Sequence, residues 1–202
     1  MTRILLVLLA LAAPTTAFVA LPAPAGSIPS GIARQLPPGY ERLSSVTMSV
    51  TRPSRIFELV ALGRIGENFR SLRGNAHARP LLIFERHGER FILVGRNDFV
   101  ILRADRGGQC DPFLDSNGSI SIKGRFFTVE NGVACGQHWT DFVTFRLDDR
   151  AGFVFDNERL ESWSLNSSDD PDAEALMRDG PQRVRRPKPG NSVRFSHWRR
   201  PR

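Results

Sequence analysis

Short stretches of alternating or wholly apolar residues, separated by turn-forming residues, dominate the chain from residue 81 onward. Strands that are half buried in a sheet alternate apolar and polar positions, whereas helices repeat apolar positions every three or four residues. Glycine, asparagine and aspartate occupy the gaps, as at Gly107-Gly108 and Asn131-Gly132, which indicates close turns. The predicted strands span residues 81–85, 91–94, 99–104, 119–123, 126–130, 139–147, 153–156 and 160–165. We therefore predict an all-β fold, an antiparallel sandwich or small barrel of about eight short strands.

Two further segments carry weaker signals. Residues 56–62 (IFELVAL) fit a helix by spacing but a strand by their β-branched and aromatic content, and we favour the strand. After the strands, Asp170 suits a helix N-cap, Asp172 its first turn and Gly180 its end. The sequence thus predicts one short C-terminal helix. We assign residues 55–180 to a single β-rich domain.

The first 25 residues have the organisation of a secretory signal peptide. Arg3 precedes an apolar run over residues 4–13, and small residues suited to cleavage follow it. The run is shorter than the ~20 residues that a membrane-spanning helix needs. We expect an exported protein, periplasmic or secreted, with no transmembrane span in the mature chain. Residues 26–54 hold four prolines and many small polar residues, which predicts a linker or extended arm.

The positive charge of the chain is concentrated at its C-terminus. The formal net charge is +7, yet eight of the 28 Lys and Arg residues lie after residue 182, with no acid among them. The rest of the chain carries 20 basic and 21 acidic residues and is close to neutral. Because this end also has prolines and few aliphatic residues, we predict a disordered basic tail over residues 181–202. Its candidate anion-binding residues are Arg185, Arg186, Arg199 and Arg200.

The C-terminal arginines are accompanied by aromatic residues, Phe195 and Trp198. Aromatic side chains between cations suit an anionic surface. In an exported protein we expect that surface to be an anionic lipid or polysaccharide of the cell envelope, in preference to nucleic acid. A purely solubilising role for the tail stays open at this point.

The tetrapeptide Arg86-His87-Gly88-Glu89 has the same letters as the motif that opens the active site of histidine phosphatases. In those enzymes the histidine ends a parallel strand, and further arginines, a second histidine and an acid complete the site. Here the segments LLIFE and RFILV flank the tetrapeptide like the two strands of a hairpin. We therefore predict a hairpin with His87-Gly88 at its tip, and no phosphatase site.

Cys110 and Cys135 are the two cysteines of the chain. An even number in an exported protein predicts a disulfide, which would close a loop of about 26 residues and stabilise the fold by roughly 3.5 kcal/mol. Two alternatives use the neighbouring His138: a zinc site completed by Asp111 or Asp141, or a reactive Cys135. We favour the disulfide and predict no metal site and no cofactor.

Four segments resemble an exported, β-rich bacterial protein family of unknown function. They are GRND at 95–98, GGQCDPF at 107–113, FTVENGVACGQHWTDFVTFR at 127–146 and DPDAEAL at 170–176. The similarity covers about residues 55–180. The resemblance implies export and a β-fold, and it supplies no activity and no catalytic residue.

We predict a non-enzymatic exported β-domain that binds an envelope component or a protein partner, with the basic tail aiding attachment to anionic surfaces. Polar groups beside aromatic residues near the predicted disulfide form the candidate binding surface. Its residues are Asp111, Phe113, Gln137, His138, Trp139 and Asp141. The alternative is a small hydrolase or metal-dependent enzyme that uses His138, Asp141 and an unpaired Cys135.

Overall fold

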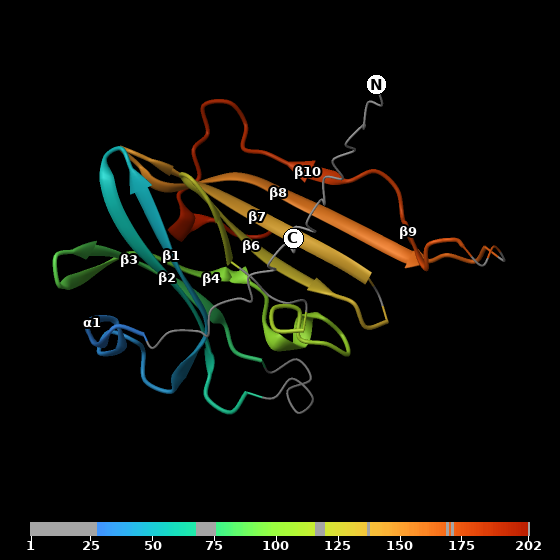
Figure 1. Cartoon of the computed structure of the whole chain (residues 1–202), viewed down its shortest axis with the longest axis horizontal. Helices are drawn as coiled ribbons and strands as arrows, with labels where there is room; N and C mark the ends of the chain where they lie inside the picture. Colours follow the sequence, from blue (N-terminus) through green and yellow to red (C-terminus); the bar gives the residue numbers. More distant parts are fainter. Residues whose placement is uncertain are drawn as a thin grey trace, which may run out of the picture.

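The computed structural model describes residues 28–67, 76–115, 120–136, 138–168, 170 and 172–201. Across these ranges, ten antiparallel strands form two sheets, and the helical elements are single turns (Figure 1). These turns are α1 (Ser30–Ala33), η1 (Ala104–Arg106) and η2 (Phe195–His197). The predicted all-β antiparallel fold is therefore confirmed.

The first sheet contains four strands in chain order, β1-β2-β3-β4. They are β1 (Tyr40–Thr51), β2 (Ser54–Arg64), β3 (Arg79–His87) and β4 (Arg90–Ile101). The second sheet has the order β10-β8-β7-β6-β5, and β9 pairs with the far end of β8. Its strands are β5 (Ile120–Lys123), β6 (Phe126–Val133), β7 (His138–Asp148), β8 (Gly152–Leu165), β9 (Leu176–Arg178) and β10 (Arg183–Arg185).

The two sheets pack face to face, since one buried cluster takes side chains from both. Phe57 and Leu81 contribute from the first sheet, and Phe127, Phe145 and Phe153 from the second. The rings of Phe127 and Phe145 stack with centroids 5.1 Å apart, and Phe57 meets Phe153 edge-on at the same distance. Inward-pointing side chains from two facing sheets are the pattern of a sandwich. The part of the chain that the structure describes contains no closed barrel.

The outer face of the first sheet is also partly buried. Ile32 of α1 forms a second apolar cluster with Val60 and Leu62 of β2 and Phe84 of β3. Strand β2 is therefore buried on both faces along much of its length. A strand covered on both faces needs no alternation of apolar and polar residues, which explains the ambiguous pattern of residues 56–62.

Two pairs of predicted strands are each one continuous strand. Residues 91–94 and 99–101 are joined through Gly95 in β4, where the register against β3 shifts. The predicted strand over 99–104 ends early, because β4 ends at Ile101 and η1 begins at Ala104. Residues 153–156 and 160–165 are joined in β8, where the register against β7 shifts. A bulge accommodates an extra residue without ending the strand, so the turn-forming residues at these places did not mark strand ends.

The prediction of a linker or extended arm over residues 26–54 is wrong for its second half. Residues 40–51 form β1, which pairs with β2 from Tyr40 opposite Arg64 to Thr51 opposite Ser54. This strand lies at the edge of its sheet. Edge strands tolerate many polar residues because one side faces solvent, so the polar composition of the segment did not exclude a strand.

The helix predicted between Asp170 and Gly180 is absent from the described part of that segment. Leu176–Arg178 form β9 and pair with the end of β8, with Leu176 opposite Leu165. The carboxylate of Asp170 accepts a 3.0 Å hydrogen bond from the backbone N–H of Asp172, which makes a turn instead of a helix cap. Pairing with a neighbouring strand thus overrides the local helix signals.

The prediction of a disordered tail over residues 181–202 is wrong for most of that segment. Arg183–Arg185 form β10 against β8, and Phe195 and Trp198 lie in the core, 2% and 1% exposed. The side-chain amide of Asn97 donates to the carbonyls of Phe195 (2.5 Å) and Trp198 (3.0 Å). Two large buried rings and this buried tether order a segment whose average composition is that of a disordered chain.

The RHGE segment forms the hairpin between β3 and β4, as predicted. His87 pairs with Arg90, and the two residues between them, Gly88 and Glu89, make the turn. The turn lies one residue later than the predicted tip. Gly88 has a φ of 61°, a left-handed conformation that glycine adopts without steric cost.

The predicted signal peptide, residues 1–25, lies outside the described residues. So does the first residue of the strand predicted over 119–123, whose remaining residues form β5. Over the described ranges, no helix is long and apolar enough to cross a membrane.

Candidate functional site

The second sheet extends past the first at the end where β7 begins and β8 ends (Figure 1). Trp139 and Asp141 occupy alternate positions of β7, so they share the inward face of the buried Val143. Together with neighbouring residues of β8 and β10 and the chain end they enclose a cavity of about 640 Å³, which we call the cleft. The cleft is lined by Leu102, Trp139, Asp141, Glu158, Leu160, Ser162, Arg183, Val184, Arg185, Arg200 and Pro201.

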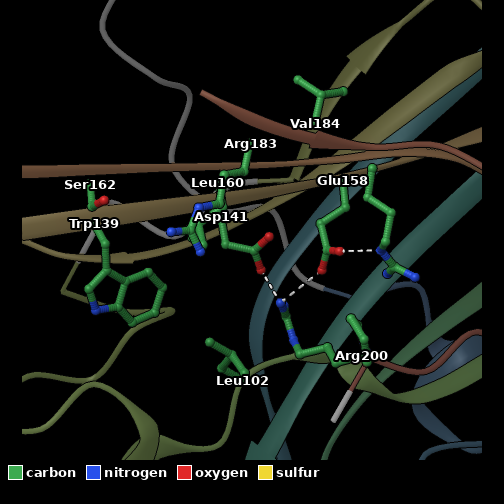
Figure 2. A pocket seen from close by; sticks show the side chains of 11 residues that line it. Leu102, Trp139, Asp141, Glu158, Leu160, Ser162, Arg183, Val184 and Arg200 are labelled. Carbon is green, nitrogen blue, oxygen red and sulfur yellow. Dashed lines mark hydrogen bonds and ion pairs between the residues drawn. The ribbon is translucent and has the colours of Figure 1, made fainter. Parts of the chain in front are cut away.

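An ion-pair network lies at one side of the cleft (Figure 2). Nη1 of Arg200 donates to Oδ2 of Asp141 and lies 3.5 Å from Oε1 of Glu158. The other oxygen of Glu158 accepts a 2.6 Å hydrogen bond from Nε of Arg185. Nη2 of Arg200 donates to the carbonyl oxygen of Val100 at 3.0 Å. The network therefore joins β4, β7, β8, β10 and the end of the chain.

Within this network, the carboxylate of Asp141 has a strongly shifted pKa. Its side chain is almost fully buried, and burial, which disfavours the ionised form, raises the pKa of Asp141 to about 6. Arg200 acts in the opposite direction, and the nearby negative charge of Glu158 adds to the increase. Asp141 therefore takes up a proton just below neutral pH.

The arginines of the cleft are held over aromatic rings. The guanidinium of Arg200 lies 5.5 Å from the ring centroid of Trp198, and that of Arg185 lies 5.0 Å from the ring of Phe155. Both rings belong to the buried core. Such cation–π contacts fix the guanidinium groups in place, so the core positions the charged side of the cleft.

A second cavity, of about 900 Å³, lies on the other side of the chain end, and we call it the arginine groove. It shares Leu102, Arg200 and Pro201 with the cleft as a common wall. Its other lining residues are Ala78, Asp98, Phe99, Ile101, Arg103, Arg106 and Arg199. The cleft and the arginine groove are thus adjacent, and the folded C-terminus separates them.

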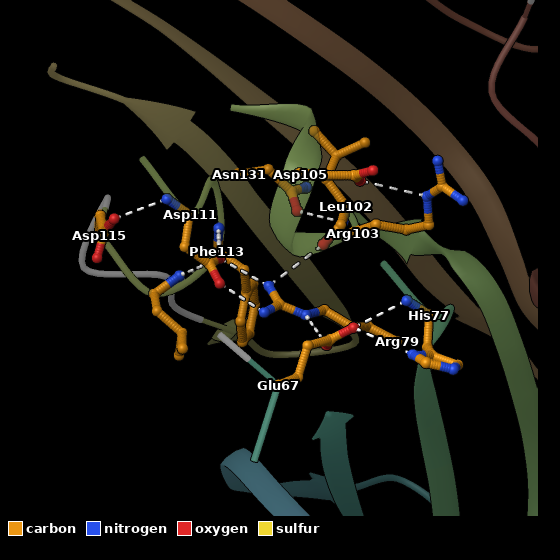
Figure 3. A network of polar contacts seen from close by, with 11 residues as sticks. Glu67, His77, Arg79, Leu102, Arg103, Asp105, Asp111, Phe113, Asp115 and Asn131 are labelled. Carbon is orange, nitrogen blue, oxygen red and sulfur yellow. Dashed lines mark hydrogen bonds and ion pairs between the residues drawn. The ribbon is translucent and has the colours of Figure 1, made fainter. Parts of the chain in front are cut away.

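Asp111 and Phe113, two residues of the predicted binding surface, line neither cavity and lie in a neighbouring polar network, in which Arg79 donates to the carbonyl of Leu102 at 3.4 Å (Figure 3). Phe113 is fully buried in the core. Asp111 forms a two-point ion pair with Arg79, at 2.6 and 2.5 Å. Burial alone would raise the pKa of Asp111, but Arg79 and the N–H groups of Leu114 and Phe113 hold it below its ordinary value. These contacts use the carboxylate fully and indicate a structural role.

The remaining predicted residues divide between the cleft and the surface. Trp139 and Asp141 line the cleft. His138 is the first residue of β7. Because side chains alternate along a strand, His138 points to the opposite face of β7 from Trp139. Gln137 lies outside the described residues. The predicted binding surface is therefore not brought together as one patch.

The four arginines predicted to bind anions have different environments. Arg185 and Arg200 are paired with carboxylates in the cleft, as described above. Arg199 lies over the ring of Phe99, 3.9 Å from its centroid, at the arginine groove. Arg186 is exposed. The two cleft arginines are thus largely neutralised by the fold.

Cys110 and Cys135 form a disulfide, with Cα atoms 6.2 Å apart, so that prediction is confirmed. A paired Cys135 is available neither as a nucleophile nor as a zinc ligand, which removes both cysteine-based alternatives. The described ranges contain no group of three or more His, Cys, Asp or Glu side chains that could hold a metal ion.

Several cleft and groove residues were not predicted from the sequence. Glu158 and Leu160 alternate along β8, so their sharing of one face could have been predicted. Leu160 lies opposite Asp141, and Glu158 lies opposite Val143. These positions depend on the register of β7 with β8, which local sequence patterns do not predict. Arg103 and Arg106 follow β4, before and at the end of the helical turn η1, and carry no sequence signal of their own.

The comparisons with known proteins return no relative. No family model, no curated protein and no solved structure matches the chain. The resemblance to an exported bacterial family of unknown function therefore stays a prediction.

Proposed function

We propose that this protein is a non-catalytic, extracytoplasmic binding domain that takes the apolar part of a cell-envelope component into the cleft. The observation that carries the proposal is the uncovered inward face of β7 and β8. Trp139 and Leu160 lie on the continuation of the face that forms the core, yet Leu160 is 37% exposed. Concave sites with apolar walls and a few fixed polar groups are typical of ligand binding.

The polar groups of the cleft support binding over catalysis. The carboxylates of Asp141 and Glu158 are engaged by Arg200 and Arg185. Cys135 is in a disulfide, and His138 lies on the other face of β7. Carboxylates that are already paired with arginines can orient a ligand without acting as nucleophiles.

The size of the cleft favours a small envelope component over a protein partner. Its volume of about 640 Å³ is in the range of small-ligand sites. Protein–protein interfaces are broad and mostly flat, with about 800 Å² buried on each side. The disulfide is consistent with an oxidising compartment outside the cytoplasm, and export itself is part of the proposal.

An uncharged fluorescent probe, N-phenyl-1-naphthylamine, tests the proposal. We expect its emission to rise when it enters the cleft, and dodecyl maltoside to displace it. The Leu160→Ser variant should weaken probe binding about tenfold, because it removes most of one apolar contact surface. Leu165→Ser is the matched control, since Leu165 lies on the same strand and is 74% exposed.

Two outcomes contradict the proposal. One is an absence of any emission change with the wild-type protein. The other is an equal effect of the two serine variants, which would place the probe away from the cleft. Circular dichroism of both variants verifies that the fold is retained.

A hydrolytic function is the second candidate, and the pKa of about 6 at Asp141 is the observation that favours it. A buried carboxylic acid that titrates near neutral pH can act as a general acid, with Glu158 as the second carboxylate. A panel of nitrophenyl glycosides and esters tests it. Turnover that is lost in Asp141→Asn and falls above about pH 6 would favour the enzyme over the binding domain.

A further inference from the structure

The lining of the arginine groove carries an excess of positive charge, which the fold balances only in part. Arg103, Arg106 and Arg199 line it, and Asp98 is the one acid among the lining residues in the described part of the chain. Asp98 accepts a 2.8 Å hydrogen bond from Arg96, which is not a lining residue, so its charge is already paired. Among the described residues, the groove is thus lined by four arginines and one acid, whereas the cleft is lined by three arginines and two acids.

The three groove arginines are held to different degrees. Arg199 is positioned over Phe99 by a cation–π contact of 3.9 Å and donates to the carbonyls of Ser196 and Trp198. Nε of Arg103 lies 3.5 Å from a carboxylate oxygen of Asp105. The exposed side chain of Arg106 has no hydrogen bond or ion pair within the described ranges. Arg106 is thus the most available cation of the groove.

We infer that the ligand is a phosphate-bearing amphiphile whose phosphate binds in the arginine groove while its apolar chain occupies the cleft. This inference rests on the proposed function and names the chemical class of its ligand. The cleft and the arginine groove are adjacent, and a molecule that occupies both would cross over Leu102, Arg200 and Pro201, which line each of them. Arg200 itself stays bound to Asp141 and Glu158 and serves as part of that wall.

The number and type of the cations favour phosphate. A guanidinium group donates two parallel hydrogen bonds to neighbouring oxygens of a phosphate. A terminal phosphate carries up to two charges and three acceptor oxygens, which match several arginines better than one carboxylate does. A fatty acid, with a single carboxylate, is therefore the less favoured amphiphile.

The apolar surroundings favour a lipid over a free phosphate. Phe99, 46% exposed, lines the groove beside the arginines, and Trp139 and Leu160 line the adjoining cleft. A soluble phosphate would leave these apolar surfaces in water. A chain attached to the phosphate would cover them and add the free energy of apolar burial.

Four defined probes separate the possibilities by titration calorimetry below micelle-forming concentrations. Dodecyl phosphate carries both the chain and the phosphate, and dodecyl maltoside carries the chain without charge. Dodecanoate carries the chain with a carboxylate, and inorganic pyrophosphate carries phosphate without a chain. We expect dodecyl phosphate to bind about tenfold more tightly than dodecyl maltoside or dodecanoate, and pyrophosphate to bind least.

Charge reversal at Arg106 tests the position of the phosphate. In Arg106→Glu, dodecyl phosphate should lose its roughly tenfold advantage, whereas dodecyl maltoside binding should stay unchanged. Arg90→Glu is the matched control, because Arg90 is also exposed but lies at the β3–β4 hairpin, outside the groove. An unchanged advantage in Arg106→Glu overturns the inference.

The remaining outcomes separate this inference from the proposed function. Equal binding of dodecyl phosphate and dodecyl maltoside keeps the proposed function and overturns the phosphate inference. Equal binding of dodecanoate and dodecyl phosphate overturns phosphate as the preferred group. Tight binding of pyrophosphate alone points to a free phosphate site and overturns the lipid assignment. No binding of any chain-bearing probe removes the proposed function as well.

Discussion

Two buried aspartates with arginine partners have pKa values that are shifted in opposite directions. The pKa of Asp111 is lowered and that of Asp141 is raised, and their contacts explain the difference. Asp111 forms a two-point pair with Arg79 and also accepts two backbone N–H groups, so its charged form is favoured. Asp141 shares Arg200 with Glu158 and accepts fewer hydrogen bonds, so burial dominates. The presence of an ion pair therefore does not by itself set the direction of a pKa shift.

The pKa of Asp141 predicts a pH-dependent term in stability. The folded pKa is about 6 and the ordinary value is 3.8, so between these pH values the folded protein holds a proton that the unfolded chain has released. The contribution of Asp141 to stability is thus fully present below about pH 4 and is lost as the pH rises through 6. The loss is on the order of 3 kcal/mol for a shift of this size.

Urea unfolding of the wild type and of Asp141→Asn from pH 4 to pH 7 measures this term. Asparagine does not titrate, so we expect the stability difference between wild type and variant to change across the window in favour of the variant as the pH rises. Carboxylates distant from Asp141 contribute equally to both proteins and cancel in the difference. Parallel stability curves over the whole range would show that Asp141 has an ordinary pKa.

At the scale of elements, local patterns predicted strand existence better than strand extent. Glycine and asparagine in β4, and the extra residue in β8, looked like strand ends but lie at register shifts within continuous strands. The acidic segment after β8 looked like a helix start, yet it leads into β9 because the end of β8 offers a pairing edge. Each of these differences arises from a neighbouring strand that local sequence does not specify.

The folded C-terminal segment predicts a large loss of stability in Trp198→Ala. The indole is 1% exposed and packs against Phe145, 5.9 Å between ring centroids, so its removal should cost about 3–5 kcal/mol. Trp163→Ala, at a half-buried residue near the end of β8, should cost less than half as much. Urea unfolding followed by circular dichroism measures both. A disordered C-terminus would give no loss in Trp198→Ala.

At the scale of the whole molecule, the cleft and the arginine groove exist because the two sheets are offset. The first sheet covers the inward face of the second as far as the buried phenylalanines, and the cleft opens where this cover ends. The C-terminal segment then crosses the opening and divides it into the cleft and the arginine groove. A site of this kind is a property of sheet placement and not of any single motif.

The disulfide predicts a global contribution to stability. Cys110 and Cys135 are 25 residues apart, and a loop of this length corresponds to about 3–4 kcal/mol in the chain-entropy model. The Cys110→Ala/Cys135→Ala double variant should lose about this amount in urea unfolding. Intact mass after alkylation should show modified thiols only after reduction of the wild type. Labelling without reduction would contradict the disulfide.

The sequence by itself determined the all-β class, the hairpin at RHGE and the disulfide. Each of these depends on local information: the alternation of side chains along a strand, a glycine suited to a left-handed turn, and the parity of cysteines. The sequence predicted the residues of the cleft only in part. Trp139 and Asp141 were predicted, but they were grouped with the structural residues Asp111 and Phe113.

The tertiary structure alone decided where the C-terminus goes and what it builds. Asp141 and Arg200 meet across 59 residues of chain, and Asn97 holds Phe195 across 98. Such contacts depend on the register of β7 with β8 and on the offset of the two sheets, which no local pattern encodes. The physical reason is that two buried aromatic rings outweigh the composition of a basic segment once a core is present to receive them.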